Sequence, residues 1–183
     1  MKELCVIVQK VSLSGRGAEI VGHVFTGSLS VGGDFAVVGE GGAVLTRCRA
    51  LVNLSTKSFV SEVSAGDDVA VILPSNMFSF LGHAYQLLGK DAMRHSRVVV
   101  SVEADADQQK KLVEKLKDIR YGQVNFPVWG KSITGAATML DSFDTHCEVL
   151  VELIYSLGCM QDLQLEYSKN GEAVLQGNIV RLL

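Results

Sequence analysis

The sequence predicts a small β-barrel in its first half and a mixed α/β (α+β) domain in its second half. Valine and isoleucine alternate with other residues over 5–11, 20–24 and 69–73, as in strands that bury one face. Glycine clusters separate these segments, and glycine supplies the backbone freedom that tight turns need. The second half combines strand-like segments with one segment whose apolar residues have helical spacing.

The domain boundaries follow from length and from a break in the strand pattern. A chain of 183 residues can form one large or two small domains, and its 48% of hydrophobic residues is ample for a core. Pro-Ser-Asn at 74–76 ends the strand pattern, because proline cannot donate a ladder hydrogen bond and Ser and Asn favour helix starts. Apolar residues then recur at steps of three and four over 77–88, which predicts an amphipathic helix. We therefore predict a barrel over 1–75, this helix and a linker over 76–94, and an α/β domain over 95–183.

The second half is predicted to place one helix after a strand at 98–102. Asp105 and Gln108 have the spacing of a capping box, in which each side chain accepts a backbone N–H of the other residue. Segment 135–143 is ambiguous, and we expect a short helix there. An Asn-Gly pair at 170–171 predicts a tight hairpin turn between the last two strands. The remaining strands of this half are expected over 124–129, 147–155, 163–167 and 173–182.

Two motifs of the first half carry a resemblance to a known family. Residues 14–27 read Ser-Gly-Arg-Gly-Ala-Glu-Ile-Val-Gly-His-Val-Phe-Thr-Gly, and residues 65–69 read Ala-Gly-Asp-Asp-Val. With Leu29, Val31, Gly32 and Asp34 between them, these motifs resemble the second domain of translational GTPases of the elongation factor Tu kind. The resemblance covers residues 4–73 and implies a β-barrel of the elongation factor Tu domain 2 type. The second half resembles no family that we recognise.

The residues that bind aminoacyl-tRNA in that family are replaced in this chain. The family uses a Gly-Val-Glu-Met-Phe-like segment before the Ala-Gly turn and an Arg-Gly pair after it. Leu54 and Thr56 stand at the positions of its glutamate and phenylalanine, and Pro-Ser at 74–75 stands at that of Arg-Gly. We therefore expect the barrel frame without the aminoacyl pocket.

Motifs for catalysis and cofactors are incomplete. Gly-Lys-Ser at 130–132 imitates the end of a phosphate-binding loop, but Asn125 stands where that loop requires a glycine. The four histidines lack the spacing of metal-ligand pairs. We expect no catalytic residue, no metal, no cofactor and no GTPase activity.

The charge pattern leaves room for a local binding patch only. With 17 Lys and Arg against 20 Asp and Glu, the chain offers no overall basic field for phosphates. Arg47 and Arg49 would share one strand face by two-residue alternation. The candidate macromolecule-binding residues are Arg16, Arg47, Arg49 and Lys57. The alternative is a solvated barrel surface without a binding role.

Composition also predicts the cellular compartment. The four cysteines form no Cys-x-x-Cys pair, which is typical of buried thiols in a reduced protein. The chain has no apolar run near the ~18 residues that a membrane helix needs, and no secretory signal at its start. We expect a cytoplasmic protein without a membrane partner.

These observations predict a noncatalytic macromolecule-binding module on a translation-factor-like barrel. The acidic balance and the replaced aminoacyl pocket favour a protein partner over RNA or the ribosome, and homo-oligomerisation is left open. The alternative is a small enzyme with a pocket between its two domains. Its candidate residues would be Cys159, His146 and His83.

Overall fold

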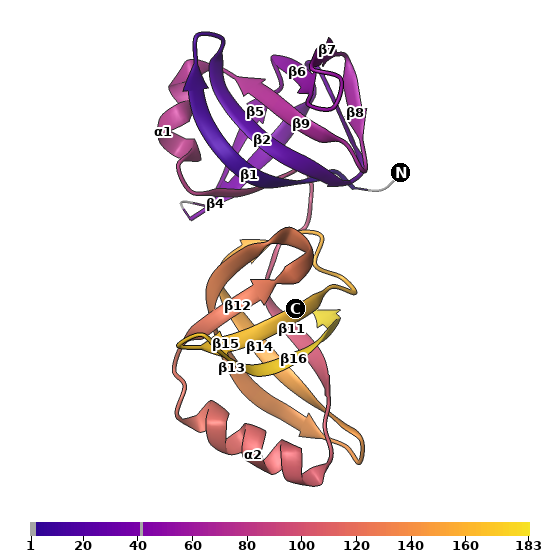
Figure 1. Cartoon of the computed structure of the whole chain (residues 1–183), viewed down its shortest axis with the longest axis vertical. Helices are drawn as coiled ribbons and strands as arrows, with labels where there is room; N and C mark the ends of the chain where they lie inside the picture. Colours follow the sequence, from indigo (N-terminus) through magenta and orange to yellow (C-terminus); the bar gives the residue numbers. More distant parts are fainter. Residues whose placement is uncertain (1–2, 41) are drawn as a thin grey trace. The chain divides into compact units, whose positions relative to one another are not determined.

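The computed structural model describes residues 3–40 and 42–183. It divides into two compact units, of which the first ends at Met93 and the second is Arg94–Leu183. Figure 1 draws the first unit in indigo to magenta and the second in rose to yellow. Within the described residues, no helix combines the length and the apolar composition that crossing a bilayer requires.

The first unit is built from antiparallel strands. Eight of them form one sheet in the order β5-β4-β10-β1-β2-β9-β6-β7, and β3 pairs with β8. The strands predicted over 5–11, 20–24 and 69–73 are confirmed as parts of β1, β2 and β9. The bounds are β1 (Cys5–Ser14), β2 (Gly17–Thr26), β3 (Ser28–Ser30), β4 (Asp34–Gly39), β5 (Gly42–Arg47), β6 (Ala50–Asn53), β7 (Ser58–Val60), β8 (Glu62–Ser64), β9 (Asp68–Leu73) and β10 (Ala84–Gly89).

This sheet curls around a single apolar core. Side chains of β1, β2, β4, β6 and β9 meet there, among them the fully buried Val6, Ile20, Phe35, Leu51 and Val71. Strands β5 and β7 are the two ends of the sheet, so pairing between the described strands does not close it into a barrel. The last strand of the sheet, β7, is only three residues long. The next strand, β8, leaves the sheet to pair with β3.

The helix predicted over 77–88 is wrong for most of its length. A 3-10 turn (Ser75–Met77) leads into a short α1 (Phe78–Leu81), and the chain then forms β10 between β4 and β1. In β10, Leu87 pairs with Val6 on one side and with Val37 on the other. Leu87 and Leu88 are both fully buried, so β10 lacks the alternation of a half-exposed strand. Its run of apolar residues therefore imitates a helix in sequence.

The second unit is a closed antiparallel barrel with strand order β11-β14-β13-β12-β15-β16. Strand β16 pairs with both β15 and β11, and the β11 pairing completes the ring. Its elements are β11 (His95–Glu103), α2 (Ala106–Lys117), β12 (Gly122–Phe126), a 3-10 turn (Pro127–Trp129), β13 (Lys131–Ser142), β14 (His146–Leu157), β15 (Gln164–Lys169) and β16 (Glu172–Leu182).

The mixed α/β domain predicted for this half is therefore wrong. Within the described residues of this unit, α2 is the one α-helix, and the short helix expected over 135–143 is part of β13. The alanines and Met139 of this segment favour helices in isolation. The barrel overrides that preference, because β13 must pair with β12 and β14 to close the ring.

Two local predictions for this half are confirmed. Asp105 and Gln108 form the capping box of α2, with both hydrogen bonds at 2.9 Å. Asn170 and Gly171 have φ of 52° and 83°, as a tight hairpin turn between β15 and β16 requires. Both signals depend only on residues close in sequence.

Helix α2 is attached to the barrel by a buried glutamine. It packs against β13 and β16 (Figure 1). The side-chain amide of Gln109 lies 2.8 Å from the carbonyl oxygen of Ala104, 2.7 Å from that of Phe143 and 3.1 Å from that of His146. Gln109 is only 6% exposed, so water cannot replace these bonds without an opening of the helix.

We expect Gln109→Leu to destabilise the second unit by about 1–3 kcal/mol, because it removes the side-chain donor from the buried carbonyl of Ala104 and from the half-buried carbonyls of Phe143 and His146. Denaturant unfolding followed by Trp129 fluorescence measures this, since Trp129 belongs to the second unit. The exposed Gln176 of β16 is the matched control, and Gln176→Leu should change stability far less. Equal stability of the two variants would contradict the attachment role.

A buried thiol makes the stability of the first unit depend on alkaline pH. Burial raises the pKa of Cys48 from 9.0 to about 11, and its Sγ donates to the carbonyl oxygen of Ala50 at 3.5 Å. Below about pH 9 the thiol is protonated in both states. Between pH 9 and 11 it ionises only in the unfolded chain, so stability falls over this range.

We expect Cys48 to account for a loss of about 2 kcal/mol between pH 9 and pH 11. Cys48→Ala should flatten this slope even though it lowers stability at neutral pH. Cys147 and Tyr167 also have raised pKa values but remain in both proteins, so their contributions cancel in the comparison. Parallel pH profiles for the two proteins, measured by denaturant unfolding, would exclude this assignment.

Candidate functional site

The four predicted cationic residues occupy different connections of the first unit. Arg16 lies in the turn between β1 and β2, and Lys57 lies in the turn between β6 and β7. Arg47 is the last residue of β5, and Arg49 follows the buried Cys48 on the way to β6. The shared strand face predicted for Arg47 and Arg49 is not formed along β5, because β5 ends at Arg47.

Arg47 is engaged by a carboxylate of the neighbouring strand. Its Nε lies 2.8 Å from Oδ1 of Asp34, and a terminal guanidinium nitrogen lies 3.4 Å from Oδ2. The guanidinium lowers the pKa of Asp34 through this hydrogen bond and through its charge, and Asp34 in turn raises the pKa of Arg47. Asp34 and Arg47 face each other in the β4–β5 pairing. Their charges offset each other, so Arg47 contributes little to a cationic patch.

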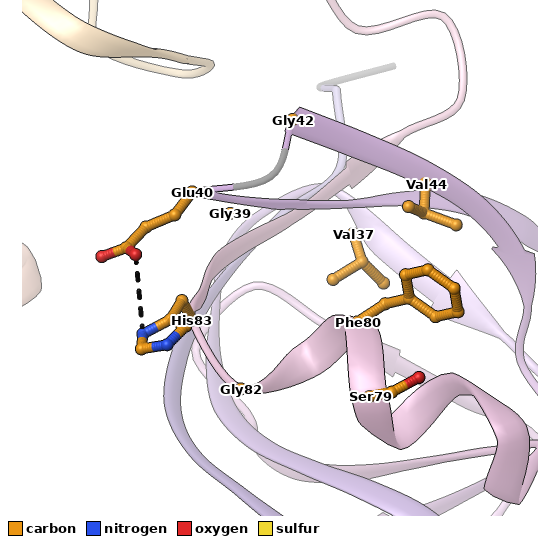
Figure 2. A pocket seen from close by; sticks show the side chains of 9 residues that line it. All are labelled: Val37, Gly39, Glu40, Gly42, Val44, Ser79, Phe80, Gly82 and His83. Atoms are coloured by element: carbon orange, nitrogen blue, oxygen red, sulfur yellow. Dashed lines mark ion pairs between the residues drawn. The ribbon is translucent and has the colours of Figure 1, made fainter.

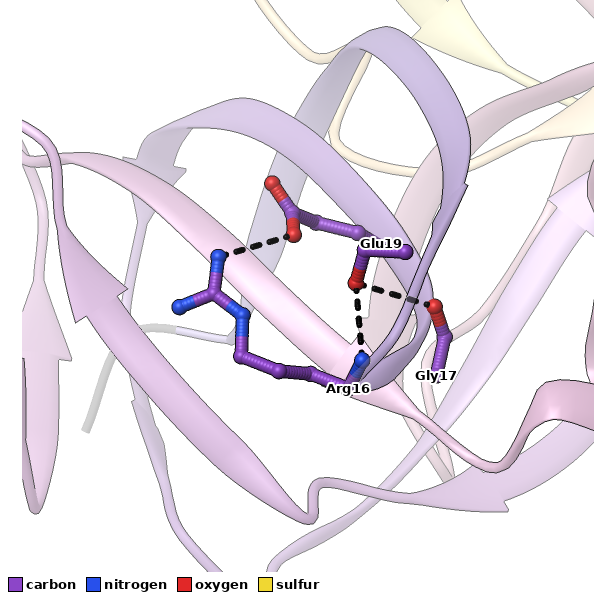
Figure 3. A network of polar contacts seen from close by, with 4 residues as sticks. Arg16, Gly17 and Glu19 are labelled. Atoms are coloured by element: carbon purple, nitrogen blue, oxygen red, sulfur yellow. Dashed lines mark hydrogen bonds and ion pairs between the residues drawn. The ribbon is translucent and has the colours of Figure 1, made fainter.

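Arg16 is held by the turn that carries it. Its backbone N–H donates to the Ser14 hydroxyl at 3.2 Å, and that hydroxyl donates to the carbonyl oxygen of Gly17 at 3.3 Å. A guanidinium nitrogen lies 3.4 Å from a carboxylate oxygen of Glu19 (Figure 3). Gly17 has φ of 133°, and a Cβ there would collide with the backbone of Leu73 in β9. Glycine thus lets this turn lie directly against β9.

The Arg16 guanidinium also lies over an exposed aromatic ring. Its Cζ is 5.8 Å from the ring centroid of Phe59, a residue of β7. Phe59 is 64% exposed, which is unusual for a phenylalanine. Lys57 is exposed and stands two residues before Phe59. We refer to Arg16, Lys57 and Phe59 as the Phe59 surface.

Asn53 organises the turn that carries Lys57. Its Oδ1 accepts the backbone N–H groups of Ser55 and Thr56 at 3.0 and 3.1 Å. Its Nδ2 donates to Asp67 at 3.3 Å, which ties this turn to the Ala-Gly-Asp-Asp turn. Lys57 takes a left-handed φ of 55° at the end of the turn. The motif that carries the family resemblance therefore positions one edge of the Phe59 surface.

The positions of the family's aminoacyl pocket fall in the same turn. The backbone N–H of Leu54 donates to the carbonyl oxygen of Asp68 at 2.9 Å. The hydroxyl of Thr56 lies 2.7 Å from that of Ser58. Both residues thus have structural roles in a surface turn.

Phe59 was missed by the sequence analysis. Its segment, Ser-Phe-Val at 58–60, has the composition of an ordinary half-buried strand. The aromatic ring is identified as part of a surface only by its exposure and by the approach of Arg16, which is distant in sequence.

The residues named for an enzymatic alternative are distributed over both units. His83 belongs to the first unit and lies 3.7 Å from Glu40. His146 and Cys159 belong to the second unit, where His146 stacks on Phe143 with ring centroids 4.4 Å apart. An enzymatic site that joins these residues stays a prediction. Among residues 3–40 and 42–183, no group of three or more His, Cys, Asp or Glu side chains could hold a metal ion.

The Gly-Lys-Ser segment does not form a phosphate-binding loop. Gly130 ends a 3-10 turn, and Lys131 begins a strand where such a loop would begin a helix. Ser132 instead donates its hydroxyl to Asn125 at 2.5 Å across the β12–β13 pair. The segment is a hairpin connection.

Comparison with known proteins identifies the fold. No protein-family model matches the chain, and no curated protein matches it. Among solved structures, it resembles the one titled "Crystal structure of bacterial selenocysteine-specific elongation factor EF-Sec", with a TM-score of 0.74 and 20% sequence identity. The match covers 100% of this chain and 28% of that chain, so both units take part in the likeness. The chain therefore has a mostly β, translation-factor-like fold and spans about 28% of the length of that elongation factor.

Proposed function

We propose that this chain is a noncatalytic RNA-binding module that acts in the cytoplasm and contacts RNA through the Phe59 surface. In this proposal the first unit is an open, barrel-like sheet related to domain 2 of elongation factor Tu, which the sequence had predicted as a barrel. The observation that carries the proposal is the exposed Phe59 ring, with the Arg16 guanidinium over it and Lys57 beside it in sequence.

The chemistry of the Phe59 surface suits single-stranded RNA. Proteins that bind single strands stack bases on exposed aromatic rings and contact the phosphates with cationic side chains. An arginine guanidinium is planar and can itself stack on a base or bind a phosphate. Arg16 lies at a hairpin tip, and Lys57 lies in a second turn, so both cations are on the solvent side of the sheet.

The charge of the chain limits the expected affinity. The formal net charge is -3, and Glu19 offsets part of the charge of Arg16. Attraction to phosphates must therefore come from a few local cations, and binding should be weak at physiological salt. The overall charge alone favours a protein partner, whereas the exposed ring and the Arg16 guanidinium over it favour RNA. We give more weight to the local groups, because they are the ones that would contact a ligand.

The fold similarity is compatible with a binding role. The similar structure is described as a selenocysteine-specific elongation factor. The polar side chains of the Phe59 surface are a guanidinium and an ammonium group, and its three residues include no carboxylate, thiol or imidazole. Binding without turnover is therefore the simplest use of this surface.

We expect Phe59→Ala and Arg16→Ala each to weaken binding of a fluorescein-labelled single-stranded RNA about tenfold, as measured by anisotropy, because one stacked base contributes about 1–3 kcal/mol. Arg16→Ala should also reduce the slope of log affinity against log salt by about 1. Leu45, which is 67% exposed in β5, provides a matched control, and Leu45→Ala should leave the affinity unchanged.

The same variants separate RNA from a protein partner. If RNA affinity is equal in all three variants, the proposed contact is wrong. If Phe59→Ala instead abolishes a ribonuclease-resistant complex with a purified protein, the surface binds protein and the RNA proposal fails.

A further inference from the structure

The first unit contains a second candidate site, which shares no residue with the Phe59 surface. A cavity of about 240 Å³ lies between the β4–β5 hairpin and the segment from α1 to β10 (Figure 2). Glu40 and His83 form its polar end. Val37, Val44 and Phe80 form its apolar wall. The cavity thus has two chemically distinct ends.

The carboxylate at the polar end is held in position. The hydroxyl of Tyr85 donates to Oε1 of Glu40 at 2.8 Å, and Nδ1 of His83 lies 3.7 Å from Oε2. The Glu40 side chain is 43% exposed, so a ligand can reach the carboxylate beside Tyr85 and His83. Because the carboxylate is already fixed, ligand binding costs less conformational entropy at this side chain.

The apolar wall contains another exposed aromatic ring. Phe80 of α1 is 65% exposed, and Figure 2 shows its ring beside Val44 and Val37. Leu81 is the buried side chain of α1, so the exposed Phe80 does not contribute to the core packing of this helix. The carboxylate of Glu40 and the ring of Phe80 line opposite ends of one cavity, which suits a ligand that carries a cationic group at one end and an apolar stem at the other (Figure 2).

The two sides of the cavity are fixed to each other through the backbone. A Cβ on Gly39 would lie 2.5 Å from the carbonyl oxygen of His83, so only glycine allows this approach. The backbone N–H of Glu40 donates to the same carbonyl oxygen at 3.3 Å. Gly39 also pairs with Ala84 at the start of β10. Glu40 and His83 are therefore brought together by the sheet itself.

We propose that this cavity binds a small organic cation, an ammonium or guanidinium group on a short apolar stem. The cationic group contacts Glu40, and the stem lies along Phe80 and Val44. A volume of about 240 Å³ is below the roughly 300–1,000 Å³ of sites for drug-sized ligands, so it suits a group the size of one side chain. The carboxylate disfavours an anionic ligand at the same place.

The test is a titration of the full chain, followed by amide chemical shifts, with phenethylamine and with agmatine as probes. We expect shifts confined to the residues around the cavity, and about tenfold weaker binding to Glu40→Gln, because a hydrogen bond to a charged group contributes about 1.5–3 kcal/mol. Phe80→Ala should also weaken binding. Glu62→Gln removes another exposed carboxylate of the same unit and should have no effect.

Two further measurements keep the proposal open to refutation. Tyr85→Phe keeps the Glu40 carboxylate but removes the hydroxyl that donates to it. We expect this variant to lose less affinity than Glu40→Gln. Phenylacetate has a similar stem with the opposite charge and should not bind. Equal binding of phenylacetate and phenethylamine, or unchanged affinity in Glu40→Gln, overturns the proposal.

The source of the cation is distinguished by a blocked arginine, N-acetyl-arginine N-methylamide. Tighter binding of the blocked arginine than of agmatine supports a basic side chain of another chain as the occupant, and the reverse order supports a free amine. Phe59→Ala should leave all these affinities unchanged. Failure of the RNA proposal and failure of the cation proposal are therefore separate outcomes.

Discussion

The need to pair every backbone group of an inner strand determines how the first unit is arranged. Strand β10 lies between β4 and β1 and bonds to both, so without it two strands of the sheet would have unpaired edges inside the fold. This requirement turns residues 84–89 into a strand and shortens the preceding helix to four residues. It also brings the start of β10 against the end of β4, which creates the contact between His83 and Glu40.

The parts of the fold that could be predicted from sequence depend on neighbours in the chain. Alternation in β1, β2 and β9, the capping box at Asp105 and the Asn-Gly hairpin all meet this condition. Strands β10 and β13 do not, because their identity depends on partners supplied by distant segments. Leu87 and Leu88 are buried on both faces, and Ala136 and Ala137 favour a helix locally. Tertiary pairing decides both cases.

The candidate sites were predictable to a smaller extent. Arg16 and Lys57 could be named as cations in turns, but the role of Phe59 depends on its exposure in β7 and on the approach of Arg16, which is distant in sequence. The ion pair between Arg47 and Asp34, in contrast, could have been predicted from the sequence. Counting outward from the glycine turn that pairs Gly39 with Gly42 places Asp34 opposite Arg47. Hairpin register thus identifies which surface cations are already neutralised, whereas aromatic exposure requires the folded chain.

The burial of thiols in both units gives a way to measure local opening in this protein. Cys5 and Cys48 are buried in the first unit and Cys147 in the second, whereas Cys159 of the second unit is partly exposed. Cys48 lies in the core of the first unit and Cys147 in the interior of the second, and both are shielded from solvent. A thiol-modifying reagent can reach either residue only when its own unit opens. Labelling rates that are resolved residue by residue for Cys48 and Cys147 therefore report the opening of each unit separately. Their difference would reveal whether the two units unfold as one cooperative body or as separate ones.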